Sequence, residues 1–157
     1  MILEAIELAR ITGGSLSGDE TRYVTGIMTD SRAPGAGPEM LFIALRGPTH
    51  DGHRFVEPLY GRGVRLFLVD TLPGNHREMA GASFVKVSDT LEALHSLAKW
   101  CRENFRGKVI AVTGSTGKTI VKERLAGVMS MTKSVIRSPK SYNSQVGVAL
   151  SLLNLDD

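Results

Sequence analysis

A short glycine-rich segment late in the chain has the residue types needed to hold phosphate groups. Glycine lets the backbone curl so that successive N–H groups point at phosphate oxygens, and a following helix adds its positive N-terminal end. In such a loop the lysine reaches the β- and γ-phosphates of ATP, and the threonine hydroxyl ligates Mg²⁺. We therefore expect an ATP and Mg²⁺ site with Lys118 and Thr119 as its catalytic residues. The full segment is Thr113, Gly114, Ser115, Thr116, Gly117, Lys118 and Thr119.

The alternative is a glycine-rich turn that joins a strand to a helix and binds nothing. The general phosphate-loop pattern has a further glycine five positions before Gly117, and Val112 stands there instead. The segment thus matches a shorter variant, TGxxGKT. Since the Lys-Thr pair follows the glycine and the segment separates an apolar run from a helical pattern, phosphate binding is the favoured interpretation.

The elements around this segment have the order of an α/β protein. We expect strands at 108–112 and 134–136 and helices at 118–131 and 145–153, an order that implies a parallel sheet with crossover helices. Before them, the patterns predict helices at 2–10, 54–60 and 90–105 and strands at 23–28, 40–45, 64–69 and 83–87. Asp89 is expected to cap the helix that follows it. Gly107 ends that helix, so we predict one domain over 1–106 and the incomplete beginning of a second over 107–157.

Composition and charge exclude several classes of function. The net charge of +3 comes from Lys and Arg scattered along 157 residues, without the basic stripe typical of nucleic-acid binding. No window is apolar over a membrane-spanning length, and the N-terminus lacks the pattern of a signal peptide. The one cysteine, Cys101, has no partner for an internal disulfide. We expect a cytoplasmic protein without nucleic-acid or membrane partners, and the oligomeric state stays open.

Three segments of the chain resemble the Mur ligases, the enzymes that add amino acids or dipeptides to UDP-N-acetylmuramic acid in peptidoglycan synthesis. The first combines Thr29-Asp30-Ser31-Arg32 with residues 41–47 and 51–55 (Asp51-Gly52-His53-Arg54-Phe55). The second is the TGxxGKT loop, and the third is residues 138–148, which contain Asn143. Within the family the resemblance is closest to the MurF type, in particular to the MurF half of fusions with alanine racemase.

The resemblance implies a small N-terminal UDP-binding domain followed by the start of a phosphate-loop, parallel-sheet ATPase domain. It also implies an ATP-dependent ligase with UDP-N-acetylmuramoyl-tripeptide and D-alanyl-D-alanine as substrates. The acidic metal ligand and the adenine contacts would follow Asp157, so this chain alone is expected to bind but not to ligate. The residues expected to contact the UDP-sugar are Ser31, Arg32, Asp51, Gly52, His53, Asn143 and Ser144.

Each of these assignments has a plainer alternative. Ser31 and Arg32 could belong to a solvated loop in which Asp30 and Arg32 cap backbone groups. Asp51 and Gly52 could simply set the turn before a helix, and Ser144 could cap the helix at Gln145. At the level of function, the alternatives are a non-catalytic nucleotide-sugar binding module and a P-loop NTPase or small-molecule kinase.

Overall fold

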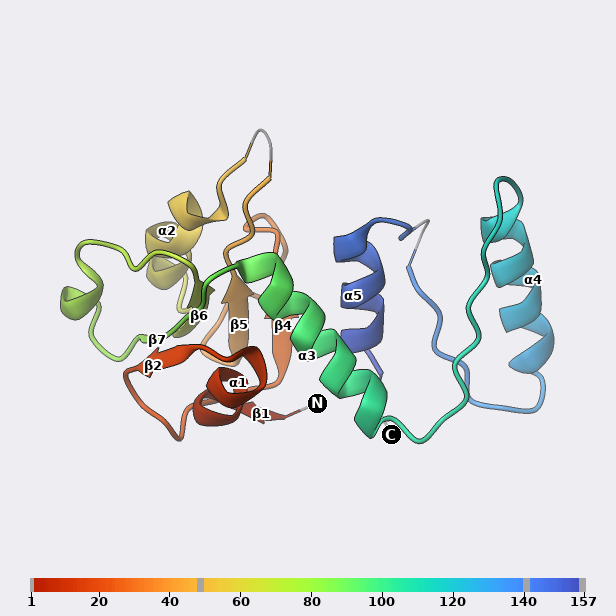
Figure 1. Cartoon of the computed structure of the whole chain (residues 1–157), viewed down its shortest axis with the longest axis horizontal. Coiled ribbons are helices and arrows are strands. Elements are labelled where there is room, and N and C mark those ends of the chain that lie inside the picture. Colours follow the sequence, from red (N-terminus) through yellow and green to blue (C-terminus); the bar gives the residue numbers. More distant parts are fainter. Residues whose placement is uncertain (1, 48–49, 140–141, 156–157) are drawn as a thin grey trace. The chain divides into compact units, whose positions relative to one another are not determined.

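The computed structural model describes residues 2–47, 50–139 and 142–155, and the chain forms two compact units, Met1–Leu97 and Ala98–Asp157 (Figure 1). The division falls inside helix α3 (Thr90–Asn104). The domain boundary expected from the sequence, between residues 106 and 107, lies shortly after this helix and stays a prediction.

The first unit is built on a mainly parallel sheet. Its strands have the order β2-β7-β6-β5-β4, in which β4 to β7 are parallel and only β2 is antiparallel to its neighbour. The predicted α/β class is therefore confirmed. The bounds are β2 (Ser15–Ser17), β4 (Gly26–Met28), β5 (Met40–Ile43), β6 (Leu66–Val69) and β7 (Ser83–Lys86).

The strand expected over 23–28 is in fact two strands in two different sheets. Strand β3 (Tyr23–Val24) pairs antiparallel with β1 (Leu3–Glu4), whereas β4 begins at Gly26 and pairs with β5. Between them the N–H group of Thr25 donates to the carbonyl of Glu39. Periodicity alone could not show this change of partner, because both halves of the segment are extended and apolar.

Three phenylalanines on adjacent strands form the centre of the core. Phe42, Phe67 and Phe84 are in register across β5, β6 and β7 and are buried. The ring of Phe67 stacks on Phe84 with centroids 5.3 Å apart and meets Phe42 edge-on at 6.5 Å. Val56 and Leu59 belong to the same buried cluster. This packing holds the strand ends in fixed positions.

Helices join the strands and cover the sheet. Asp89 accepts hydrogen bonds from the N–H groups of Leu91 and Glu92, so its predicted role as the cap of α3 is confirmed. The helix predicted over 2–10 is α1, which begins only at Ala5 because Leu3–Glu4 pair with another strand, and Gly13 is its C-terminal capping residue. The remaining bounds in this unit are α1 (Ala5–Thr12), η1 (Gly52–Phe55), α2 (Val56–Gly61) and η2 (His76–Glu78).

The second unit contains the helices that the sequence predicts, α4 (Lys118–Met129) and α5 (Gln145–Leu153), but not the strands. The expected strands at 108–112 and 134–136 are wrong for this structure, because neither segment has a paired neighbour among the described residues. The side chains of Val109 and Ile110 are 41% and 54% exposed, unlike those of a buried parallel strand. Among the described residues no helix is long and apolar enough to cross a membrane.

Candidate functional site

Polar residues of the first unit follow the carboxyl ends of three neighbouring strands of the sheet. Thr29 to Arg32 follow β4, Arg46 follows β5, and Asp70 and Thr71 follow β6. Because these strands are parallel, their carboxyl ends meet at the same edge, which is where ligands bind in open α/β sheets.

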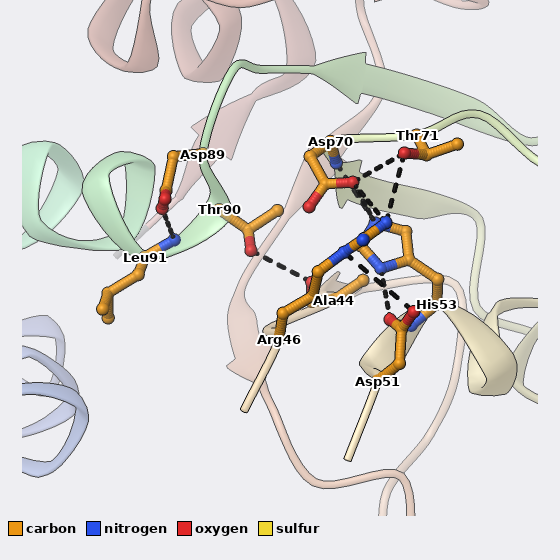
Figure 2. A network of polar contacts seen from close by, with 9 residues as sticks. All are labelled: Ala44, Arg46, Asp51, His53, Asp70, Thr71, Asp89, Thr90 and Leu91. Atoms are coloured by element: carbon orange, nitrogen blue, oxygen red, sulfur yellow. Dashed lines mark hydrogen bonds and ion pairs between the residues drawn. The ribbon is translucent and has the colours of Figure 1, made fainter. Parts of the chain in front are cut away.

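Figure 2 shows a polar network at this edge, centred on His53 and Asp70. The Arg46 guanidinium donates to Asp70 Oδ1 at 2.9 Å and to the hydroxyl of Thr71 at 3.3 Å. The imidazole of His53 lies between two carboxylates, with Nδ1 2.7 Å from Asp51 Oδ1 and Nε2 3.3 Å from Asp70 Oδ1. The network joins the loop after β5 to the end of β6.

The hydrogen bonds assign the proton of the His53 ring. The N–H of Asp70 donates to Nε2 at 3.2 Å, so Nε2 acts as an acceptor and Nδ1 carries the proton that it donates to Asp51. The backbone N–H of His53 and then its ring lower the pKa of Asp51 below its ordinary value. Asp51 is therefore a carboxylate that fixes the loop, and its Oδ1 also accepts the N–H of His53 at 3.0 Å.

Gly52 has a structural reason to be glycine. A Cβ at this position would lie 2.8 Å from the carbonyl oxygen of Leu45 and 2.9 Å from the carbonyl carbon of Ala44. The N–H of Gly52 donates to that same Leu45 oxygen at 2.9 Å, so the two backbone segments are drawn together. The interpretation of Asp51-Gly52 as a turn before a helix is confirmed, and a direct contact of either residue with a ligand stays a prediction.

Ser31 and Arg32 lie in the loop after β4. The guanidinium of Arg32 makes a two-pronged contact with Asp30, at 3.0 Å from Nε and 2.9 Å from Nη2, and its N–H also donates to Asp30. The Arg32 hydrogen bonds lower the pKa of Asp30 to about 2. The carbonyl of Ser31 accepts from Arg62. The capping alternative is thus confirmed for Asp30, which accepts a backbone N–H, whereas the contacts of the Arg32 side chain are with the Asp30 carboxylate. Neither arrangement conflicts with ligand binding by Arg32.

The phosphate loop precedes α4 directly, as the sequence indicates. Gly117 is the N-terminal capping residue of α4 with φ of 78°, and Gly114 has φ of 144°, both in the range that favours glycine. The first helical bond runs from Val121 to Gly117, so by helix geometry the N–H groups of residues 118–120 have no acceptor within the helix. These N–H groups and the glycine-rich loop match the arrangement expected of a phosphate site, and phosphate binding stays a prediction.

The side chains of the loop are open to solvent, with one exception. Lys118 is half-buried and its ammonium donates to the carbonyl oxygens of Gly114 and Ser115, the latter at 3.3 Å. Thr119 is exposed in the first turn of α4. Thr113, Ser115 and Thr116 are exposed as well, so every expected phosphate contact remains accessible.

Asn143 and Ser144 lie immediately before α5. The hydroxyl of Ser144 accepts the N–H of Gly147 at 3.0 Å, so its role as a helix cap is confirmed, while contact with a diphosphate stays a prediction. Asn143 is exposed. Residues 140–141 of the same family-like segment lie outside the described residues.

The donor set restricts what could hold a metal ion. No group of three or more His, Cys, Asp or Glu side chains suited to a metal occurs in the described parts of the chain. The exposed hydroxyl of Thr119 is consistent with Mg²⁺, which is usually bound by few protein ligands together with phosphate oxygens and water. The residues thus fit a Mg²⁺ that arrives with a nucleotide.

Four residues near the predicted site were not singled out from the sequence: Arg46, Arg62, Asp70 and Thr71. A usable signal existed for Asp70 and Thr71, because they directly follow the apolar run 64–69 and so stand at the carboxyl end of a predicted strand. Arg46 lies within a family-like segment but is one of many exposed arginines. Nothing local marks Arg62, whose partners are about thirty positions away.

Comparison with known proteins relates this chain to one family of ligases. The family described as "Mur ligase family, catalytic domain" matches residues 23–100. The UDP-N-acetylmuramoyl-tripeptide–D-alanyl-D-alanine ligase of Haemophilus influenzae is 33% identical over 159 residues, covering 99% of this chain and 34% of that protein.

Solved structures agree with the sequence match. A crystal structure of MurF from Acinetobacter baumannii has a TM-score of 0.88 at 31% identity and covers 99% of this chain and 33% of its own. The MurF ligase of Thermotoga maritima, in complex with ADP, has a TM-score of 0.70 at 28% identity and covers 85% of this chain and 30% of its own. This chain belongs to the Mur ligase family. It spans about a third of the length of these relatives.

Proposed function

We propose that this chain supplies the nucleotide-sugar site and the phosphate loop of an ATP-dependent ligase that joins D-alanyl-D-alanine to UDP-N-acetylmuramoyl-tripeptide. The observation that carries the proposal is the match over 99% of the chain to a ligase of that name. The fold supports it, because the same chain contains a parallel sheet with a polar carboxyl edge and a separate phosphate loop.

In this proposal the nucleotide sugar binds at the carboxyl edge of the first unit. Ser31 and Arg32 make direct contacts, since they are the polar residues of the loop after β4 and Arg32 is exposed. The planar guanidinium of Arg32 matches a phosphate as well as it matches Asp30. The segment Asp51-Gly52-His53 mainly fixes the shape of the site. Its polar atoms already form the hydrogen bonds that join the loop after β5 to the end of β6. We keep Asn143 and Ser144 as proposed contacts of a diphosphate, as the family resemblance implies.

The phosphate loop then acts on ATP. Lys118 exchanges the carbonyls of Gly114 and Ser115 for the β- and γ-phosphates, and the N–H groups at the start of α4 stabilise the charge on the transferring phosphoryl group. Mg²⁺ held by Thr119 and the phosphates would add electrostatic stabilisation. The Thermotoga maritima relative was solved in complex with ADP, which supports the adenine nucleotide in this proposal.

The proposed reaction has two steps. A carboxylate oxygen of the tripeptide attacks the γ-phosphorus and ADP leaves, which gives an acyl phosphate. The amine of D-alanyl-D-alanine then attacks the acyl carbon, phosphate leaves and the amine loses a proton, which gives the amide. Residues of this chain bind and orient in both steps, and we place the reaction in the cytoplasm, where ATP and UDP-linked precursors are available.

Calorimetric titration with UDP-N-acetylmuramoyl-tripeptide tests the proposal. The wild-type chain should bind, Ser31→Ala and Arg32→Ala should bind about tenfold or more weakly, and Ser96→Ala, an exposed serine of α3, should match wild type. Binding of Mg-ATP without any affinity for the nucleotide sugar would reject the proposal in favour of a general P-loop NTPase. Binding of the nucleotide sugar without Mg-ATP would favour a non-catalytic binding module.

A further inference from the structure

Arg62, the first residue after α2, holds the loop that follows β4. Its Nη1 donates to the carbonyl oxygen of Ser31, and its Nη2 donates to the carbonyl oxygen of Ala33 at 3.1 Å. Both contacts join residues about thirty positions apart in sequence. The guanidinium therefore connects the end of α2 to the loop that contains Ser31 and Arg32.

Within the described part of the chain, the other hydrogen bonds of residues 30–33 join members of that same segment. Arg32 is bound to Asp30 through its guanidinium and its N–H, and the N–H of Ala33 donates to the carbonyl of Asp30. These local bonds shape the turn but do not fix its direction relative to the sheet. Among the described residues, Arg62 provides the side-chain hydrogen bonds that reach this turn from another element.

The residue after Arg62 also lies near this loop. A Cβ on Gly63 would lie 3.7 Å from the Cα of Gly37 and 4.0 Å from the ring of Pro38, so the turn after α2 is close to the far end of the loop. Ala33 and Ala36 pack against the aromatic core from the same loop. The residues that follow α2 thus bind the loop near its start, through Arg62, and lie close to its far end.

The chemistry of arginine suits this role and the chemistry of lysine does not. A guanidinium presents its donors in a rigid plane, so it can fix two carbonyl oxygens at a set spacing, whereas an ammonium is a single point charge. Arg62 forms no ion pair in the part of the chain that is described, and both of its terminal nitrogens are used on neutral carbonyls. Its contacts therefore serve the geometry of the loop.

We infer that Arg62 is a positioning residue for the nucleotide-sugar site: it directs Ser31 and Arg32 toward the ligand without touching the ligand itself. The inference rests on the proposed function, because that function places the UDP-sugar at this loop. None of the segments that carry the family resemblance contains Arg62. Arg62 acts through the loop. Its loss should therefore weaken binding only to the extent that binding depends on the orientation of Ser31 and Arg32.

The test measures the affinity of the full chain for UDP-N-acetylmuramoyl-tripeptide in Arg62→Ala, Arg62→Lys and Arg77→Ala. Arg77 is an exposed arginine of η2 and serves as the matched control. We expect about tenfold weaker binding in Arg62→Ala, as lost hydrogen bonds to a charged donor imply, a smaller loss in Arg62→Lys, and no change in Arg77→Ala. Affinity for Mg-ATP and the unfolding midpoint should stay at the level of the control.

A double-mutant cycle separates positioning from general stabilisation. If Arg62 acts through the loop, Ser31→Ala should cost less affinity in the Arg62→Ala background than in wild type, whereas independent effects would add. Full additivity, or a parallel fall in Mg-ATP affinity and unfolding midpoint, would overturn the role of Arg62. So would an Arg62→Ala chain that binds the nucleotide sugar as wild type does. If the wild-type chain has no affinity for UDP-N-acetylmuramoyl-tripeptide, the proposed function is overturned instead, and with it the identity of the ligand.

Discussion

The two units carry two proposed sites, and the fold positions these sites in very different ways. In the first unit, four parallel strands pair in register and place Phe42, Phe67 and Phe84 in a fully enclosed core. In the second unit, the buried residue of α4 is Ala126, while Val128 and Met131 are 67% and 82% exposed. The edge proposed to bind the nucleotide sugar therefore depends on tertiary packing, whereas the proposed phosphate loop depends on the local geometry of a helix start.

This difference shows what each kind of site needs. His53, Asp70 and Arg46 are brought together from a loop and two strand ends, so they form a network only when the sheet forms. Lys118 and Gly114 are four residues apart and meet within one turn of chain. Substitutions should accordingly damage the first site through the fold and the second site directly.

Truncation of the core phenylalanine should have the largest effect. Phe67→Ala removes a buried ring that touches two others, and we expect a loss of about 3–5 kcal/mol in the free energy of unfolding. Val128→Ala, in the exposed part of α4, should change it by less than about 0.5 kcal/mol. Urea denaturation followed by far-UV circular dichroism measures both. Similar losses in the two variants would contradict the contrast between the units.

Removal of the loop lysine should affect binding but not folding. Lys118→Ala should lower Mg-ATP affinity about a hundredfold, which is about 3 kcal/mol, because charge-assisted contacts to two phosphates are lost. The unfolding curve should not move, since the side chain contacts only its own loop. Lys133→Ala, an exposed lysine after α4, is the control for calorimetric titration. Retained Mg-ATP affinity in a folded Lys118→Ala chain would refute the assignment.

A methyl group at Gly52 tests whether this residue is needed for the structure of the loop at the sheet edge. Gly52→Ala places a Cβ 2.8 Å from the Leu45 oxygen, and we expect about 1–3 kcal/mol of destabilisation with weaker nucleotide-sugar binding. Gly61→Ala is the matched control, because its Cβ meets nothing within 4 Å. Thermal unfolding and calorimetry on both variants measure the effect. A Gly52→Ala chain as stable as Gly61→Ala would show that the close approach to Leu45 is not needed.

The Asp30–Arg32 pair should give the smallest effect. The folded-state pKa of Asp30 is about 2, below its ordinary value of 3.8, so the carboxylate stabilises the folded loop above about pH 4. This contribution is lost as the pH falls from about 4 through about 2. Solvent screening at this exposed site limits it to about 0.5 kcal/mol. Carboxyl ¹³C chemical shifts report the titration, and Arg32→Ala should return the pKa toward 3.8. A midpoint near 3.8 in wild type would contradict the pairing.

Local patterns predicted the local structure well. Ser144 and Asp89 cap the helices expected after them, and the bounds of α5 agree with the apolar pattern of 145–153. The phosphate loop is a local motif too, so its position before α4 follows from the order of residues. In each case the deciding contacts lie within four residues of one another.

Non-local contacts account for what the sequence did not predict. Whether residues 108–112 form a strand depends on a hydrogen-bonded neighbour, which no property of Val109 or Ile110 reveals. The same applies to Thr25, where the chain changes from one sheet to another. His76 is half-buried with its ring 6.2 Å from that of Phe84, a contact that no local pattern around His76 indicates. In each case the local sequence does not show which distant segment of the chain a residue will contact.

The most direct test of the account is titration of one sample of the wild-type chain with UDP-N-acetylmuramoyl-tripeptide and, separately, with Mg-ATP. The account predicts one site for each ligand. Nucleotide-sugar binding should be unchanged in Lys118→Ala, because the two proposed sites are formed by different parts of the chain. Binding of Mg-ATP with no affinity for the nucleotide sugar would contradict it and would leave the carboxyl edge of the first unit without the function proposed here.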